Sequence, residues 1–289
     1  MLMRATPALV VAAALALGAC GSSNDSTSSS PASASTPASA QSCDKANLSL
    51  YKSGQLTVAT DKPAFPPYFE DNKPENGKGF ESAVAYAIAK KLGFAPTEVK
   101  WVVEPFNSSY APGPKKFDFD VNQISINPAR SKRVDFSPPY FTAPQAVVVP
   151  KGSSAVGITS LSDLASKKIG VQIGTTSLDA VNQTVKPSQQ PQVYNDSNDV
   201  VQALKQKRID AVVVDLPTAF YITAAQVPGS KIVGQFAAPG GDNWGALLAK
   251  DSKLTPCVSK AVSELRSDGT LDALQKKWMG AAAGAPELS

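Results

Sequence analysis

The sequence predicts an α/β protein in which mainly parallel sheets are flanked by helices. Short apolar runs typical of strands alternate with stretches of helical periodicity from residue 56 onwards, as in βαβ units. The chain has 289 residues, of which 43% are hydrophobic and 18% are charged, which is enough for a large core divided between two lobes. Ligands of such sheets bind at the carboxyl ends of the strands, so functional residues are expected there.

The first nineteen residues are typical of a secretion signal. Arg4 is followed by an apolar run of 12 residues at 8–19, whereas a membrane span needs about 20. The run ends in LGAC, which resembles the bacterial lipobox, where the signal is cleaved before a cysteine that then carries lipid. We therefore predict a lipoprotein signal peptide at 1–19 and lipidation of Cys20. The alternative is an ordinary secretory signal that happens to end near a cysteine.

The segment that follows, GSSNDSTSSSPASASTPASAQS, contains almost no side chain that is both apolar and large enough to bury. Such composition is typical of disordered linkers. Residues 20–42 are therefore predicted to be a lipid-anchored Ser/Ala/Pro tether.

The cysteines agree with an oxidising location outside the cytoplasm. Three are present, and lipidation of Cys20 would leave Cys43 and Cys257 as an even pair. We predict a disulfide between them. The alternative is two separate buried thiols.

The predicted elements follow one another in the order of an α/β fold. A strand at 56–60 precedes a helix at 80–92, which has apolar residues at helical spacing before the stop at Gly93. Further strands are predicted at 167–173, 211–215 and 231–236, and helical stretches at 174–185 and 197–207. The region 254–280 is typical of two helices separated at Asp268-Gly269.

Composition excludes several classes of function. The chain has no histidine, which rules out Ser-His-Asp and Cys-His catalysis, zinc sites that need histidine and a histidine general base. The formal net charge of +4 is too small and too scattered for nucleic-acid binding. We predict no catalytic residue, no cofactor and no metal.

Arg130 is the first candidate for ligand binding. It follows a strand-like run in QISINPARSKRVDFSPPYF, residues 123–141. A planar guanidinium can hold a carboxylate through two parallel hydrogen bonds. The alternative is that Arg130, Lys132 and Arg133 form a solvated basic face.

Two other features complement Arg130. GTTS, residues 174–177, lies where a strand gives way to a helix, and backbone N–H groups at such a turn can receive an anion. Thr175 or Thr176 can equally be an ordinary N-cap. Asp215 ends the apolar strand AVVVD and can receive an ammonium, or it can simply begin a turn. Because burying both charges of an amino acid is costly unless both are paired, the three features together predict a zwitterion receptor.

Several motifs occur in an order that resembles one family. These are VATDKPAFPPY, GFESAVAYAIAKKLG, SINPARSKRVDFSPPYF, GTTS, AVVVD and SDGTLDALQKKW, and they extend over residues 55–280. The chain resembles the family 3 solute-binding proteins, the amino-acid receptors of ABC importers. The resemblance implies a two-lobed, hinged periplasmic-binding-protein fold of type II that closes around its ligand and presents it to membrane permease subunits.

The resemblance also implies a division of the chain. The first lobe would comprise 43–145 and 238–280, the second lobe 146–237, and a tail 281–289 would follow, with hinges near 143–147 and 236–241. The protein would act as a monomer, anchored by lipid to the cell membrane on its outer side.

By the same resemblance, individual positions take roles in the site. Arg130, Ser125 and Thr175 or Thr176 would hold the ligand carboxylate, and Asp215 would hold the ammonium. Phe65 would lie against the ligand side chain and Asp61 would bind its polar end; the alternatives are a core aromatic residue and a turn carboxylate. Further possible pocket residues are Tyr68, Phe106, Asn127 and Tyr140.

Two departures from the family pattern limit the prediction. Glu81 stands where an aspartate commonly follows Gly-Phe, and a loop rich in Pro and Gly at 105–116 replaces the short helix usual in the family. Asp61 favours a polar or cationic ligand such as glutamine, asparagine, arginine or lysine. The alternatives are a cyclohexadienyl dehydratase on the same fold, with Glu81, Glu104 or Asp61 as its acid, and a ligand sensor for a membrane kinase.

Overall fold

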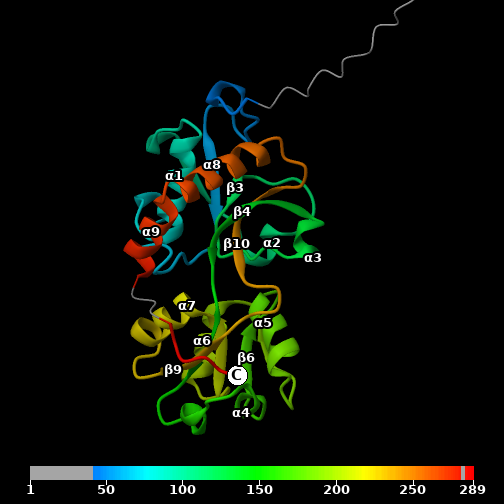
Figure 1. Ribbon diagram of the computed structural model, residues 1–289, viewed down its shortest axis with the longest axis vertical. Coiled ribbons are helices and arrows are strands. Elements are labelled where there is room, and N and C mark those ends of the chain that lie inside the picture. Colours follow the sequence, from blue (N-terminus) through cyan, green and yellow to red (C-terminus); the bar gives the residue numbers. More distant parts are fainter. Residues whose placement is uncertain (1–41, 281–283) are drawn as a thin grey trace, which may run out of the picture. The chain divides into compact units, whose positions relative to one another are not determined.

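The computed structural model describes residues 42–280 and 284–289 (Figure 1). The predicted signal peptide, the lipidation at Cys20 and all but the last residue of the tether therefore lie outside the described residues. The strands are β1 (Leu56–Thr60), β2 (Val99–Val103), β3 (Phe119–Asp120), β4 (Val134–Thr142), β5 (Gln145–Val149), β6 (Ile169–Gln172), β7 (Gln192–Tyr194), β8 (Ala211–Asp215), β9 (Lys231–Phe236) and β10 (Asn243–Ala249). The α-helices are α1 (Phe80–Lys91), α2 (Phe106–Ser109), α3 (Pro128–Ser131), α4 (Leu161–Ala165), α5 (Thr176–Ala180), α6 (Ser197–Lys205), α7 (Leu216–Tyr221), α8 (Thr255–Ser267) and α9 (Thr270–Met279).

The strands form two sheets, with orders β2-β1-β3-β10-β4 and β7-β6-β8-β5-β9. This confirms the two-lobed α/β class and the alternation of strands and helices. The sheets are mixed, however, and not mainly parallel as predicted: β1 pairs in parallel with β2 and β3, whereas β10 runs antiparallel to β3 and β4. In the second sheet β5 is antiparallel to both of its neighbours. The antiparallel pairs involve β5 and β10, the strands by which the chain enters one sheet after leaving the other.

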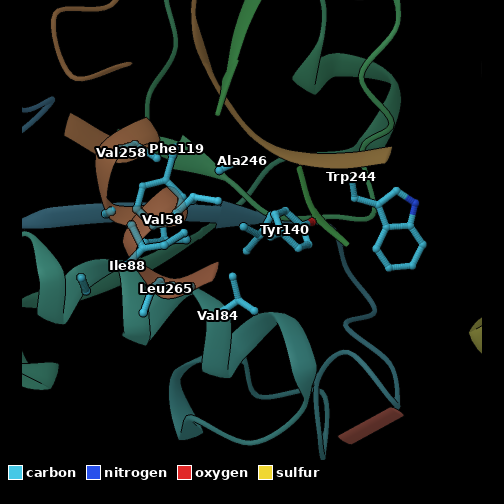
Figure 2. Packing of buried hydrophobic residues seen from close by; sticks show 14 of the residues in the cluster. Val58, Val84, Ile88, Phe119, Tyr140, Trp244, Ala246, Val258 and Leu265 are labelled. Carbon is cyan, nitrogen blue, oxygen red and sulfur yellow. The ribbon is translucent and has the colours of Figure 1, made fainter. Parts of the chain in front are cut away.

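Each sheet is covered by apolar side chains that the helical periodicity supplies. In the first sheet Val58 of β1 packs against Val84 and Ile88 of α1, and α8 adds Val258 and Leu265 to the same cluster (Figure 2). Two further clusters form around the second sheet. The helices α1, α8 and α9 accompany the first sheet in Figure 1, while α5, α6 and α7 accompany the second.

The chain passes between the sheets at 143–144, after β4, and at 237–242, after β9. Cys43 and Cys257 form the predicted disulfide, which joins the start of the described chain to α8. Residues 284–289, predicted only as a tail, lie along β9 of the second sheet: Gln235 N donates to Pro286 O and Leu288 N donates to Gln235 O, both at 2.8 Å. Within the described residues, no helix is both long and apolar enough to cross a membrane.

Candidate functional site

A cavity of about 380 Å³ is lined by residues that follow strands of both sheets. Seven predicted site residues line it: Asp61, Phe65, Phe106, Ser125, Thr175, Thr176 and Asp215. Four do not: Tyr68, Arg130, Asn127 and Tyr140. The location agrees with the rule that ligands bind beyond the carboxyl ends of the strands, since Asp61 follows β1 and Asp215 ends β8.

Phe65 and Asp61, which both line the cavity, bring an aromatic surface and a carboxylate to it. The ring of Phe65 stacks on that of Tyr221 with centroids 5.5 Å apart and planes 16° from parallel. Asp61 Oδ1 accepts a hydrogen bond from Lys62 N at 2.6 Å, and its Oδ2 accepts one from Phe106 N at 3.2 Å. These two hydrogen bonds fix the direction of the Asp61 carboxylate. One of them comes from the first residue of α2, Phe106.

Arg130 is buried beside the cavity, with 5% of its surface exposed. Its Nη1 donates to Ser125 O at 2.7 Å and its Nη2 donates to Gly174 O at 2.8 Å. The guanidinium carbon lies 4.7 Å from the ring centroid of Tyr110 and 5.4 Å from that of Phe106. Burial lowers the pKa of Arg130 from its ordinary value. The guanidinium therefore bridges two backbone carbonyls from different lobes and donates to no carboxylate of the described residues.

The hydroxyl groups predicted to hold a ligand carboxylate donate instead to Asp242. Ser125 Oγ donates to Asp242 Oδ1, and Thr176 Oγ1 donates to Asp242 Oδ2 at 2.9 Å. Thr175 is an N-cap, because its Oγ1 accepts from Leu178 N at 3.2 Å. Asp242 is 1% exposed and lies at the end of the 237–242 passage between the sheets.

Asp215 belongs to the same network. Gln145 Nε2 donates to Asp215 Oδ1 at 2.6 Å and also donates to Asp242 Oδ2, so one amide joins two carboxylates. Gln145 is fully buried and its Oε1 has no partner among the described residues. Burial raises the pKa of Asp215 well above its ordinary value, and the neighbouring charge of Asp242 raises it further.

The predicted residues that lie outside the cavity have structural partners. Tyr68 is buried and its hydroxyl lies 2.8 Å from Thr218 Oγ1. Asn127 is the N-cap of α3, where its Oδ1 accepts from Arg130 N at 2.8 Å. The hydroxyl of Tyr140 donates to Glu81 at 2.5 Å. Tyr68, Asn127 and Tyr140 thus support the walls without reaching the cavity.

The segment 105–116 differs from the loop that we predicted. It begins with one helical turn, α2, and Asn107 Nδ2 donates across the lobes to Asn195 O at 3.4 Å. Tyr110 lies so close to Gly174 that a Cβ there would collide with the tyrosine hydroxyl, and Gly174 has a φ of +73°. Glycine is therefore required at this turn.

Sequence reasoning missed Asp242, Gln145 and Tyr221. Asp242 follows Pro239-Gly240-Gly241, which indicates only a turn, and Gln145 lies within an apolar strand. The charged residues that line the cavity are the carboxylates Asp61, Asp196 and Asp215 and the cation Lys62. Among residues 42–280 and 284–289, no three acidic or cysteine side chains converge in a way that could hold a metal.

Residues 56–281 match the model of the bacterial extracellular solute-binding proteins, family 3. The L-cystine-binding protein TcyJ of Escherichia coli (strain K12) is 31% identical over 232 residues, which cover 79% of this chain and 84% of that protein. The arginine-binding extracellular protein ArtP of Bacillus subtilis (strain 168) is 31% identical over 277 residues, or 93% of this chain and 96% of that protein. The solved structure of an ancestral arginine-binding protein bound to glutamine is 38% identical, with a TM-score of 0.64, over 78% of this chain and 98% of that one.

Proposed function

The chain belongs to the bacterial extracellular solute-binding proteins of family 3, and we propose that it is the amino-acid receptor of an ABC importer. The observation that supports the proposal is the cavity between the two lobes, which is lined by Asp215, Asp61 and Phe65 and has the buried Arg130 beside it, bonded to the backbone of the lining residue Ser125. A zwitterion needs both signs of charge in a buried site, and this arrangement provides both. The ligand is a polar or cationic amino acid.

In this proposal the amino acid lies along the cavity. Asp215 holds the ammonium. Arg130 holds the carboxylate, after one of its hydrogen bonds to a backbone carbonyl is replaced by a hydrogen bond to the ligand. The ligand side chain lies against Phe65 with its polar end toward Asp61, a pairing that favours N–H donors over acids. The names of the relatives support such a range, since they specify cystine and arginine, and the ancestral arginine-binding structure holds glutamine.

The cellular location that we propose for the protein rests on its family and on its N-terminal sequence. We propose that residues 1–19 are cleaved, that Cys20 carries lipid and that 20–42 tether a monomeric receptor to the outer side of the cell membrane. The disulfide between Cys43 and Cys257 supports an oxidising compartment. Hinges at 143–147 and 236–241 would allow the lobe 146–237 to close on the lobe made of 43–145 and 238–280, and permease subunits would bind the closed form.

A binding screen tests the proposal directly. The purified chain is titrated with the twenty amino acids, with sugars and with prephenate, and its melting temperature is followed. A ligand at 100 times its dissociation constant adds about 2.7 kcal/mol to stability, so a true ligand gives a visible rise. One polar or cationic amino acid is expected to stand out, whereas a response to prephenate or a sugar alone would contradict the proposal.

Arg130→Ala checks the role of the guanidinium. It is expected to weaken amino-acid binding by more than about 2 kcal/mol, because a buried carboxylate would lose its partner. Isothermal titration of the variant beside the wild type measures this change. Unaltered affinity would remove Arg130 from the site and leave the receptor function to be explained by other residues.

The dehydratase alternative receives no support from the cavity. An enzyme of that kind needs an acid placed over its substrate. Of the three candidate acids, Glu81 and Glu104 do not line the cavity, and the Glu81 carboxylate already accepts hydrogen bonds from Tyr140 and Gln123. Asp61 does line it, but its carboxylate already accepts hydrogen bonds from Lys62 N and Phe106 N.

A further inference from the structure

The groups expected to bind a ligand carboxylate and those expected to bind a ligand amine differ in the number of hydrogen bonds that they already make within the protein. Arg130 donates to the carbonyls of Ser125 and Gly174. The hydroxyls of Ser125 and Thr176 donate to Asp242. A ligand carboxylate must therefore displace internal hydrogen bonds before it gains any from these side chains.

The groups expected to receive an amine are acceptors that have few donors. Asp215 lines the cavity, accepts a hydrogen bond from Gln145 Nε2 and shares a hydrogen bond with the neighbouring Asp242 carboxyl. Gln145 Oε1 is enclosed and unpaired, on a side chain that is fully buried. Asp242 adds a second carboxylate that shares the same amide. Of these three residues Asp215 lines the cavity, and an ammonium placed there supplies three N–H donors.

The balance of charge points the same way. The charged side chains lining the cavity are three carboxylates, Asp61, Asp196 and Asp215, and one cation, Lys62. Two further buried charges lie behind the cavity lining: the negative charge of Asp242 and the positive charge of Arg130, which offset each other. A carboxylate on the ligand adds a further negative charge to this region, whereas a second cation reduces the excess. A ligand with a positive group at each end pairs Asp215 with one and Asp61 with the other.

We propose that the receptor also binds amines that have no carboxylate, namely linear diamines and guanidino-amines with the length of a cationic amino acid. The amine is anchored by Asp215, with Gln145 holding the aspartate in place and Asp242 adding to the local negative charge. The distal cation lies against Phe65 and pairs with Asp61. This inference rests on the proposed function for the place and orientation of the ligand, and it changes which end of the ligand anchors it.

Three ligands that differ in one group test the proposal. Arginine carries guanidinium, ammonium and carboxylate; agmatine lacks the carboxylate; and the 2-hydroxy analogue of arginine keeps the carboxylate but replaces the ammonium with a hydroxyl. Isothermal titration of the purified chain measures all three. We expect agmatine to bind within about tenfold of arginine and the hydroxy acid at least about 30-fold more weakly, since a neutral hydroxyl replaces the positive charge beside Asp215.

Matched variants assign the effect to residues. Asp215→Asn and Asp242→Asn are expected to weaken the binding of both arginine and agmatine, while Arg130→Gln is expected to weaken arginine at least about tenfold more than agmatine. Asp251→Asn is the control, because it removes an exposed carboxylate in a turn after β10. Since the ligand series uses the wild-type chain, it decides the question even if a variant fails to fold.

The outcomes separate this inference from the proposed function. If arginine binds but agmatine binds more than about tenfold more weakly, the carboxylate anchors the ligand; the inference then fails and the amino-acid receptor stands. If another amino acid binds more tightly than arginine, the test uses that amino acid, with its decarboxylated analogue in place of agmatine and its 2-hydroxy analogue in place of that of arginine. If no amino acid binds, the proposed function fails; agmatine binding in that case supports the inference, and its absence overturns it.

Discussion

At the scale of single residues, Asp215 illustrates what sequence can and cannot predict. Its place at the end of an apolar strand is a local pattern, so its position at the ligand-binding edge was predictable. Its partners were not, because Gln145 lies 70 residues away and Asp242 lies in a turn. The same holds for Arg130, whose partners are backbone carbonyls that have no sequence signal. Residue type and strand position are local, while hydrogen-bond partners depend on the assembled fold.

The raised pKa of Asp215 predicts a pH-dependent affinity. An ammonium binds the ionised carboxylate, so affinity is expected to rise as pH increases through this raised pKa and to fall below it. The groups facing Asp215 are Asp242, which raises its pKa, Arg130, which lowers it, and Tyr68 and Gln145. Asp242→Asn removes the like charge and is expected to move the pH midpoint of affinity downward. Titrations of wild type and variant from pH 4 to 8 measure the midpoint, and coincident profiles would contradict the coupling.

Glu81 makes a second prediction at this scale, concerning stability. Burial raises the pKa of Glu81 from 4.5 to about 7, despite hydrogen bonds from Tyr140 and Gln123 that oppose the shift. Because the folded carboxyl keeps its proton to higher pH than the unfolded one, its favourable contribution is complete below about pH 4.5. That contribution, about 3 kcal/mol for a shift of this size, is lost as pH rises through about 7.

Glu81→Gln is therefore expected to flatten the fall in unfolding free energy between pH 4.5 and 8. Urea unfolding at several pH values measures this slope. Burial also raises the pKa values of Asp120 and Asp215, so part of the slope remains in the variant. Glu75→Gln, at an exposed position, is the control. An identical slope in Glu81→Gln and wild type would mean that Glu81 is ionised in both states.

At the scale of elements, the strands and helices were predictable because their periodicity is local, but their pairing was not. The run at 231–236 was predicted as a strand, and nothing in it indicated that it would lie at a sheet edge covered by residues 284–289. Edge strands expose unpaired backbone groups, and the C-terminal segment pairs with those of Gln235 in β9. Gly234 is part of this arrangement, because a Cβ there would collide with the side chain of Leu288.

The covering of β9 predicts a measurable loss on truncating one side chain. Leu288 is 5% exposed and belongs to the apolar cluster of the second sheet. Leu288→Ala is expected to lower the unfolding free energy by about 2 to 3 kcal/mol and to speed hydrogen exchange at the Gln235 amide, which donates to Pro286 O. Ser289→Ala, which changes an exposed side chain of the same segment, serves as the matched control. If Leu288→Ala is as stable as both Ser289→Ala and the wild type, the Leu288 side chain adds nothing to the stability of the second lobe.

At the scale of the whole molecule, hydrogen bonds between side chains of one lobe and groups of the other join the two lobes around the cavity. The Tyr68 hydroxyl meets Thr218, and Arg130 meets Gly174. Asp242 links the two lobes most directly. Ser125 follows β3 of the first sheet, Thr176 follows β6 of the second, and both hydroxyls donate to the Asp242 carboxylate. The family resemblance predicted two lobes and a cavity, but the contact at Asp242 depends on how the 237–242 passage folds between them.

Because Asp242 accepts from both lobes at once, its carboxylate favours closure in the same way that a bridging ligand does. Asp242→Ala removes three charge-assisted hydrogen bonds, from Ser125, Thr176 and Gln145, each worth about 1.5 to 3 kcal/mol, and those from Ser125 and Thr176 form together only when the lobes meet. The ligand-free variant is therefore expected to be more open than the wild type. Small-angle scattering, or a pair of distance probes on exposed positions of the two lobes, measures this opening. Thr142→Ala is the control, since its hydroxyl bonds to Asn243 of the neighbouring strand within the first sheet. If the distance between the lobes is the same in Asp242→Ala, Thr142→Ala and wild type, closure depends on the other contacts across the cavity and Asp242 acts on the ligand alone.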